Sequence, residues 1–222
     1  MLFRTPWIAL ISLTLLGMAG MLRAETATDE GLRAYLMDEQ EEVRLAATAG
    51  PEGITRGASY HVLRPQGFVK VKDGTNGFHC FVERSWTGPA PDNSLNFNPR
   101  VRAPHCINPE GARTTMQEIF LISRLALAGK TPEDIRDAVD RAYSDGTLTL
   151  PTELSLTYMM SGHQFLGDRV GAWHPHVMLW IPYLTEQQVG SIAGFNNPNA
   201  FLAGKPGSRR SVLVFPVPQF IE

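Results

Sequence analysis

The stretch GFHCFVERSW, residues 77–86, places a histidine and a cysteine side by side in a segment that alternates like a β-strand. The second of the two cysteines, Cys106, also follows a histidine, in PHCINPEG, residues 104–111. The repeated His-Cys pair matches no standard metal-ligand spacing. A disulfide between Cys80 and Cys106 would close a loop of about 27 residues and contribute on the order of 3 kcal/mol of stability. We therefore expect this cross-link, with two free or metal-bound thiols as the alternative.

The N-terminus has the three-part layout of a secretory signal peptide. Arg4 lies near the start, an apolar run follows from Trp7 to about Met18, and small residues lead to Ala24. This run is short for a membrane span. We predict a signal peptide over residues 1–24, with an uncleaved anchor as the alternative because Arg23 weakens the cleavage site. Export to the periplasm or the medium would carry the cysteines to an oxidising compartment.

The remaining chain, residues 25–222, fits one domain with a sizeable core. The whole sequence has 20 Lys and Arg against 22 Asp and Glu, and two arginines lie in residues 1–24, so residues 25–222 carry a net charge of about −4. No concentrated basic run is present, which argues against a nucleic-acid partner. No later stretch is long and apolar enough to cross a bilayer, so we expect a soluble mature protein.

Periodicity and end signals predict separate groups of helices and strands. The predicted helices span residues 29–49, 115–128, 132–143 and 185–192, and the predicted strands span 59–64, 67–72, 78–84, 154–160, 176–181 and 211–217. Because the two kinds of element are segregated, the sequence favours an α+β fold with a mainly antiparallel sheet packed against two or three helices. We expect the first three strands to form an antiparallel meander.

Residues 87–112 are rich in Pro, Asn and Gly and lack periodicity, which predicts a long loop that Cys106 ties down. The apolar residues of the 115–128 segment predict a central core helix, with Thr115 and Glu118 as its capping box. Thr131 is expected to cap the following helix.

Three histidines near the C-terminal half suggest a metal site. His174 and His176 are two residues apart around a proline that favours extended backbone, so both rings can point to one face. His163 can supply a third nitrogen. A divalent metal is therefore a candidate cofactor, although no carboxylate lies in the segment to complete the ligand set. Hydrogen-bonded structural histidines are the alternative.

Hydrolysis is a second chemical candidate. Ser161, in MSGHQ, is the candidate nucleophile and His163 or His176 the candidate base, although the G-x-S-x-G pattern is absent and Ser-Gly is also turn chemistry. Glu83 lies on the strand face opposite Cys80 and can act as a general acid or base if it is buried. We interpret it as a surface charge, paired with Arg84 or Arg113.

Aromatic residues accompany these polar positions and can form either core or the walls of a small-molecule pocket. They are Trp86, Trp173, Trp180, Tyr158 and Tyr183. We expect any functional surface where the loop from Thr87 to Ala112 meets the strand from His174 to Trp180.

Three segments together resemble a set of exported bacterial proteins with no assigned activity. They are GTNGFHCFVER (residues 74–84), PHCINPEGARTT (104–115) and HPHVMLWIPYLT (174–185). The resemblance covers the chain from about residue 55 onward and implies export and a single domain.

We therefore expect an exported domain that binds a small molecule or a metal ion. An exported hydrolase or metal-dependent enzyme that uses His163, His174 and His176 is the first alternative. An envelope interaction protein without a pocket is the second.

Overall fold

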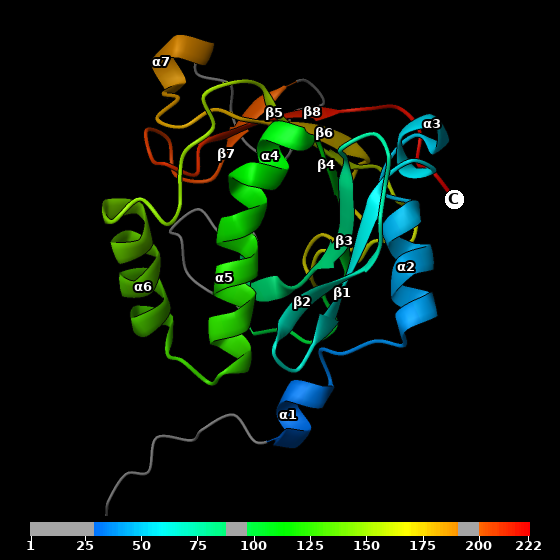
Figure 1. The fold of residues 1–222 in the computed structure, drawn as a ribbon. Coiled ribbons are helices and arrows are strands. Elements are labelled where there is room, and N and C mark those ends of the chain that lie inside the picture. Colours follow the sequence, from blue (N-terminus) through cyan, green and yellow to red (C-terminus); the bar gives the residue numbers. More distant parts are fainter. Residues whose placement is uncertain (1–28, 88–96, 191–199) are drawn as a thin grey trace, which may run out of the picture.

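The computed structural model describes residues 29–87, 97–190 and 200–222 (Figure 1). The predicted signal peptide, residues 88–96 of the predicted loop and the end of the predicted 185–192 helix lie outside the described residues. Within them, eight strands form one sheet in the order β2-β1-β3-β4-β5-β6-β8-β7. The strands are β1 (Ser59–Arg64), β2 (Gly67–Lys72), β3 (His79–Glu83), β4 (Ala103–Ile107), β5 (Ser155–Met159), β6 (His176–Trp180), β7 (Phe201–Ala203) and β8 (Val212–Pro216).

Within the described residues, the helices come before β1, between β4 and β5, and between β6 and β7. They are α1 (Asp29–Arg33), α2 (Glu39–Ala47), α3 (Glu52–Thr55), α4 (Pro109–Arg113), α5 (Thr115–Leu127), α6 (Pro132–Ser144) and α7 (Glu186–Val189), with a 3₁₀ turn at Ser85–Thr87. The α+β class and the mainly antiparallel sheet are confirmed. None of the helices in the described residues has the length and hydropathy that a membrane span requires.

The predicted antiparallel meander is wrong, because β3 pairs with β1 in parallel. After the β1–β2 hairpin, residues 73–78 cross the beginning of β1 and place β3 on its other side. Thr75 N–H donates to the Gly57 carbonyl over 2.7 Å during this crossing. Gly74 permits the close approach, since a Cβ there would lie 2.3 Å from the backbone of Ala58 and Ser59. A side chain at this position would force the crossing apart.

The predicted loop over residues 87–112 contains a strand and a helix. β4 pairs with β3 on one side and with β5 on the other, and α4 follows it directly. All five residues of β4 are buried, so the strand shows no apolar–polar alternation, and Pro104 adds a signal typical of a loop. β7 is also absent from the predicted elements.

The predicted helix over residues 29–49 is interrupted between α1 and α2. Asp38 starts α2 by accepting hydrogen bonds from the Gln40 and Glu41 N–H groups. The interruption leaves the Tyr35 carbonyl free of helical bonding, and this carbonyl accepts a hydrogen bond from buried Arg84 over 2.8 Å. The break in the helix therefore supplies a hydrogen-bond acceptor for the buried guanidinium of Arg84.

The capping predictions have mixed outcomes. Thr131 and Asp134 form a capping box at the start of α6. The box predicted for Thr115 and Glu118 is absent, because α4 ends immediately before α5 and the N-cap is Thr114, which makes no side-chain cap bond. Glu118 is instead buried and bonds outside its own helix.

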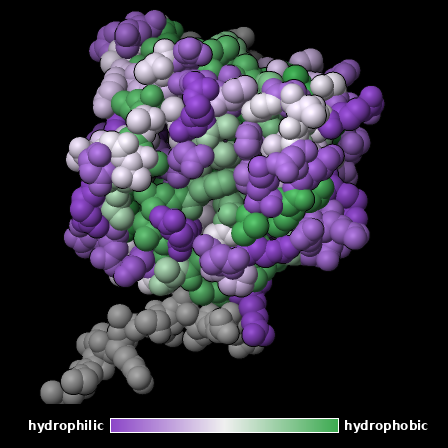
Figure 2. All heavy atoms as spheres, viewed as in Figure 1, coloured by the Kyte–Doolittle hydropathy of each residue, from purple (hydrophilic) through white to green (hydrophobic). Residues whose placement is uncertain are grey.

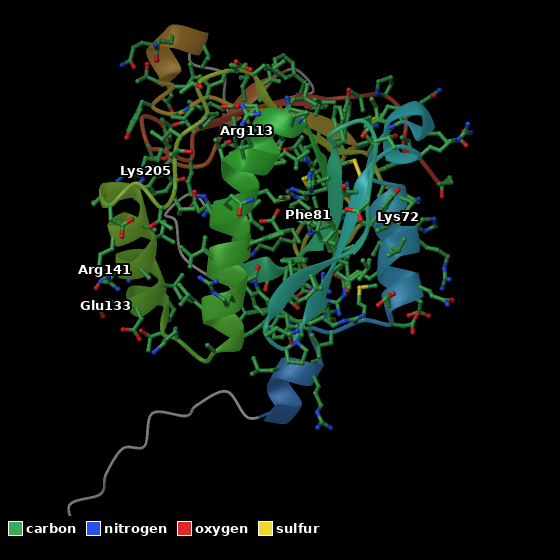
Figure 3. All side chains as sticks on the ribbon, viewed as in Figure 1. Lys72, Phe81, Arg113, Glu133, Arg141 and Lys205 are labelled. Carbon is green, nitrogen blue, oxygen red and sulfur yellow. A yellow bond between two sulfur atoms is a disulfide. The ribbon has the colours of Figure 1, made fainter. Side chains whose placement is uncertain are left out.

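Helices cover both faces of the sheet (Figure 1). α5 packs on one face, with Phe81 from β3 between it and the sheet (Figure 3), and α6 lies on its outer side. α2 packs on the other face against β1, β3 and β4. α5 is thus the central core helix, as predicted. Charged and polar residues dominate the periphery of the α5–α6 side, and apolar surface shows in its middle (Figure 2).

Candidate functional site

The two faces of β3 and β4 carry different side chains because successive residues of a strand point in opposite directions. Cys80 lies directly across from Cys106, and the predicted disulfide joins them. We call this side the cysteine face. The opposite side, which we call the histidine face, carries Phe81 across from His105, and Glu83 across from Ala103.

Glu83 is buried on the histidine face and contacts His105. Its Oε2 lies 2.7 Å from His105 Nε2, and both side chains are almost inaccessible to solvent. Burial alone would raise the Glu83 pKa, but His105, followed by Thr87 and Arg210, holds this pKa below its ordinary value. The carboxyl is therefore ionised and accepts the Nε2 hydrogen of His105.

The interpretation of Glu83 as a surface charge paired with Arg84 or Arg113 is wrong. Arg84 points to the other side of the sheet and pairs with Glu42. Arg113 is exposed and pairs with Glu110.

The second ring nitrogen of His105 is buried without a partner. Nδ1 makes no hydrogen bond within the described residues, although its atom is closed to solvent. Because Nε2 donates to Glu83, Nδ1 carries the lone pair when the ring is neutral. A carboxylate that holds one imidazole nitrogen while the other is free is the arrangement of a general base or of a hydrogen-bond acceptor for a ligand.

His176 lies near His105 on the histidine face. It pairs with Met159 across β5–β6 and is 4% exposed. Its Nδ1 donates to the His174 carbonyl over 2.8 Å, so Nε2 carries the lone pair. Burial is the main cause that lowers the His176 pKa to about 4, and repulsion from His105 and His174 adds to it. Burial therefore keeps His176 as a neutral imidazole at neutral pH.

Gln164 completes this group of buried polar side chains. Arg102 and Phe165 exchange two backbone hydrogen bonds of 2.9 Å in an antiparallel bridge, which sets Gln164 across from Ala103. Its Nε2 donates to the Ala172 carbonyl over 2.6 Å, but its buried Oε1 has no partner in the described residues. Ala103, with its small side chain, thus lies between Glu83 and Gln164. We call Glu83, His105, Gln164 and His176 the buried polar cluster.

Trp173 packs beside this cluster in a strained backbone conformation. Its φ is 51°, which a side chain larger than hydrogen adopts at a cost. The ring centroid lies 4.8 Å from that of His176 and 5.5 Å from that of Phe201. Of the other aromatic residues singled out, Trp86 and Trp180 belong to the core, whereas Tyr183 is 54% exposed.

The three histidines proposed as metal ligands do not form a metal site. His163 is exposed and faces Glu222 over 3.6 Å, and His174 is exposed, whereas His176 is buried. Within the described part of the chain, no group of three His, Cys, Asp or Glu side chains is placed to hold a metal ion.

Ser161 also differs from the predicted arrangement. The residue is buried, and its hydroxyl contacts the Thr48 hydroxyl over 2.5 Å and accepts the His163 backbone N–H over 3.1 Å. Neither His163 nor His176 bonds to it through a ring nitrogen. The serine therefore fixes the turn after β5, where Ser161 also bridges to Ile221.

A chain of polar contacts connects the cluster with the outside of α5. Arg210 donates to the Thr87 carbonyl, and its Nε lies 3.4 Å from Glu118 Oε1. The Tyr143 hydroxyl donates to Glu118 Oε2 over 2.8 Å, and burial, reinforced by Glu118, raises the pKa of this phenol. The same Arg210 charge also contributes to the low pKa of Glu83.

Sequence reasoning missed His105, Gln164 and Arg210. The signal for His105 was present: once the two cysteines bond across adjacent strands, the histidine beside each must point to the other face. Gln164 and Arg210 carry no such local signal, since distant pairings place them.

Comparisons of the chain with protein-family models, with curated proteins and with solved structures give no match.

Proposed function

We propose that the protein is an exported domain that binds a small polar molecule at the buried polar cluster, through a hydroxyl, amine or amide N–H of that molecule. The observation that carries this proposal is the pair of orphan acceptors, His105 Nδ1 and Gln164 Oε1. Leaving a buried polar atom unpaired costs about 1–3 kcal/mol, so native proteins pair most such atoms and each exception needs an explanation.

The chemistry of the two atoms defines the ligand group. Both are acceptors in the neutral state, and His176 adds a third lone pair at Nε2 nearby. A hydroxyl, an amine or a bound water can donate to them, whereas a carboxylate or a phosphate would be repelled by ionised Glu83. The expected ligand therefore presents donors and no anionic group at this point.

His105→Gln tests the proposal while it preserves the contact with Glu83. The glutamine Nε2 can replace the donor at the histidine Nε2 position, but nothing replaces Nδ1. Probes are ethanolamine, glycerol and N-acetylglucosamine, which carry donors, and trimethylglycine, which carries none. Binding is followed by the fluorescence of Trp173 beside His176 and by the ¹⁵N resonance of His105 Nδ1.

We expect at least one donor-bearing probe to move the Nδ1 resonance and His105→Gln to abolish its binding. His61→Gln is the matched control, since His61 is a buried histidine on the same face that pairs with His79 over 2.7 Å. The proposal would be contradicted if His105→Gln and His61→Gln lost probe binding equally. A shift of the Nδ1 resonance with trimethylglycine would also contradict it.

General-base catalysis is the second candidate, and the 2.7 Å contact between Glu83 and His105 favours it. His105 Nδ1 would take a proton from a water, whose oxygen would bond to an acyl carbon while the leaving group departs with its electron pair. Ionised Glu83 would stabilise the imidazolium. Hydrolysis of 4-nitrophenyl acetate that is lost in His105→Gln and reduced in Glu83→Gln would establish this activity. Retention of the full rate in His105→Gln would exclude it.

Export is part of the proposal and is supported by the predicted signal peptide and by the disulfide. N-terminal sequencing of protein from the periplasm or medium should begin at Glu25. Intact Met1 on membrane-bound protein would favour the uncleaved anchor.

A further inference from the structure

A second site lies on the outer side of α5, away from the four residues of the buried polar cluster. A pocket of about 360 Å³ opens between α5, α6 and the segments that carry Tyr183 and Ser208. This volume is in the range of small-molecule sites. Ile122 from α5 and Ile135 and Val139 from α6 supply apolar wall. Each of these three side chains also belongs to the core or lies at its edge, so the wall is rigid.

The charges that line the pocket do not balance. Arg209 pairs with Asp140, and its guanidinium lies 4.7 Å from the centre of the Tyr143 ring. Arg210 is 3.4 Å from Glu118 and donates to the backbone. Both acids of the lining are therefore already paired, and one positive charge remains.

That charge is Arg136. Arg136 lines the pocket, and its side chain has no ion-pair partner in the described residues. It lies one residue after Ile135 on α6, so an unpaired cation and apolar wall come from the same helical turn. An arginine presents a fork of donors that fits a carboxylate or another oxyanion.

The mouth of the pocket carries an aromatic ring in a strained position. Tyr183 has a φ of 63°, and its N–H donates to the Ser208 carbonyl over 2.8 Å, which holds this backbone in place. The side chain is 54% exposed despite its size. Non-glycine residues in this conformation cluster at ligand sites, where the strain serves to aim a side chain.

From these features we infer that the α5–α6 pocket binds a small amphipathic anion. The carboxylate of the ligand pairs with Arg136, and its short apolar chain lies along Ile122, Ile135 and Val139 under the Tyr183 ring. This site is distinct from the buried polar cluster and takes the opposite kind of head group, so each site can fail its test without the other.

The test compares sodium octanoate with 1-octanol by isothermal titration calorimetry on the full mature chain. The two probes share an apolar chain and differ in charge. We expect octanoate to bind about tenfold more tightly than octanol at low salt, and the difference to shrink as sodium chloride rises. Equal affinities for the two probes, or no binding of octanoate, would overturn the inference.

Arg136→Gln and Arg141→Gln form a matched pair on α6. Arg141 is exposed and points away from the molecule (Figure 3), so its replacement should leave octanoate affinity unchanged. Arg136→Gln should lower octanoate affinity about tenfold and leave octanol affinity unchanged. Similar losses in both variants would show a general charge effect and refute the site.

Tyr183→Gly tests the wall without relying on charge. Glycine accepts the backbone conformation that tyrosine adopts under strain, so the variant should fold at least as well as the parent. We expect weaker binding of octanoate and octanol alike. Unchanged binding of both probes would exclude the pocket mouth from the site.

Discussion

The cysteine face and the histidine face of β3 and β4 differ in how completely their side chains are paired. On the cysteine face, Cys80 and Cys106 are bonded, and Ala46 of α2 packs with them, as does Ala49, which follows this helix. On the histidine face, His105 keeps one buried nitrogen without a partner within the described residues. The same two strands therefore present a side that the disulfide closes and a side on which His105 of β4 keeps unused bonding capacity. On the disulfide side, buried Glu42 Oε2 has no partner within the described residues, but this atom belongs to α2 and not to the strands.

This difference teaches where function can reside in the fold. A polar atom that is buried and unpaired lowers stability, so its retention needs another reason. The retention of a paired buried group needs no such reason, because its bonds already offset the cost of burial. The comparison predicts that changes on the cysteine side act on stability and that changes on the histidine side act on binding and on pH dependence.

The largest expected effect is that of Glu42→Ala, on the α2 side of the sheet. Glu42 and Arg84 are both fully buried, and Glu42 Oε1 lies 2.9 Å from Arg84 Nη2. Removal of the carboxylate leaves an uncompensated buried guanidinium, which costs about 3–5 kcal/mol. Urea unfolding monitored by circular dichroism measures the change.

Glu52→Ala is the control for this prediction, since Glu52 pairs with Arg56 in full exposure on α3. Its effect on the free energy of unfolding should be small, because solvent screens an exposed ion pair. If the two variants lost similar free energies of unfolding, the burial of the Glu42–Arg84 pair would not increase its effect on stability.

The second effect is that of the disulfide. Replacement of both cysteines by alanine should lower the free energy of unfolding by about 3 kcal/mol, because the bond closes a long loop in the unfolded chain. Probe binding at the histidine face should survive at temperatures where the variant is folded. Thiol labelling of denatured, unreduced protein should find no free thiol, and two labelled thiols would contradict the cross-link.

The sequence predicts the stabilising side better than the functional side. The disulfide follows from two cysteines in a chain whose N-terminus predicts export, and β5 and β6 follow from their alternation. β4 escaped because burial on both faces removes alternation. The sequence did not predict the buried polar cluster, because the cluster depends on the register between β3, β4 and the 164–165 segment. Long-range pairings leave no periodic signal in a sequence.

The third prediction concerns acid. His176 has a pKa of about 4 in the folded protein against about 6.5 when unfolded. Between these values the unfolded chain binds a proton that the folded chain does not, so stability is unaffected above pH 6.5 and falls as the pH drops toward 4. Between the two pKa values, the free energy of unfolding falls by at most about 1.4 kcal/mol for each pH unit of acidification.

His176→Asn isolates this contribution, since asparagine can still donate to the His174 carbonyl but does not titrate. Urea unfolding at several values between pH 7 and pH 4.5 should show a shallower slope than the parent. His61→Asn should reduce the slope as well, because burial lowers the pKa of His61 to about 4. Parallel pH profiles for the parent and His176→Asn would show that the ring is not held neutral.

The smallest effect is expected for Ser161→Ala, which separates the two hydrolytic arrangements. The Ser161 hydroxyl contacts Thr48 Oγ1, which itself donates to the Leu45 carbonyl over 2.7 Å, so Ser161 donates to Thr48. Loss of this bond should cost about 1 kcal/mol. Because Thr48 is the shared partner, Thr48→Val should cost a similar amount, and the double variant should cost less than the sum.

Hydrolysis of 4-nitrophenyl acetate, if His105 acts as its base, should be unchanged in Ser161→Ala. A complete loss of hydrolysis at unchanged stability would instead make Ser161 the nucleophile, and would require the turn after β5 to rearrange until a histidine reaches the hydroxyl.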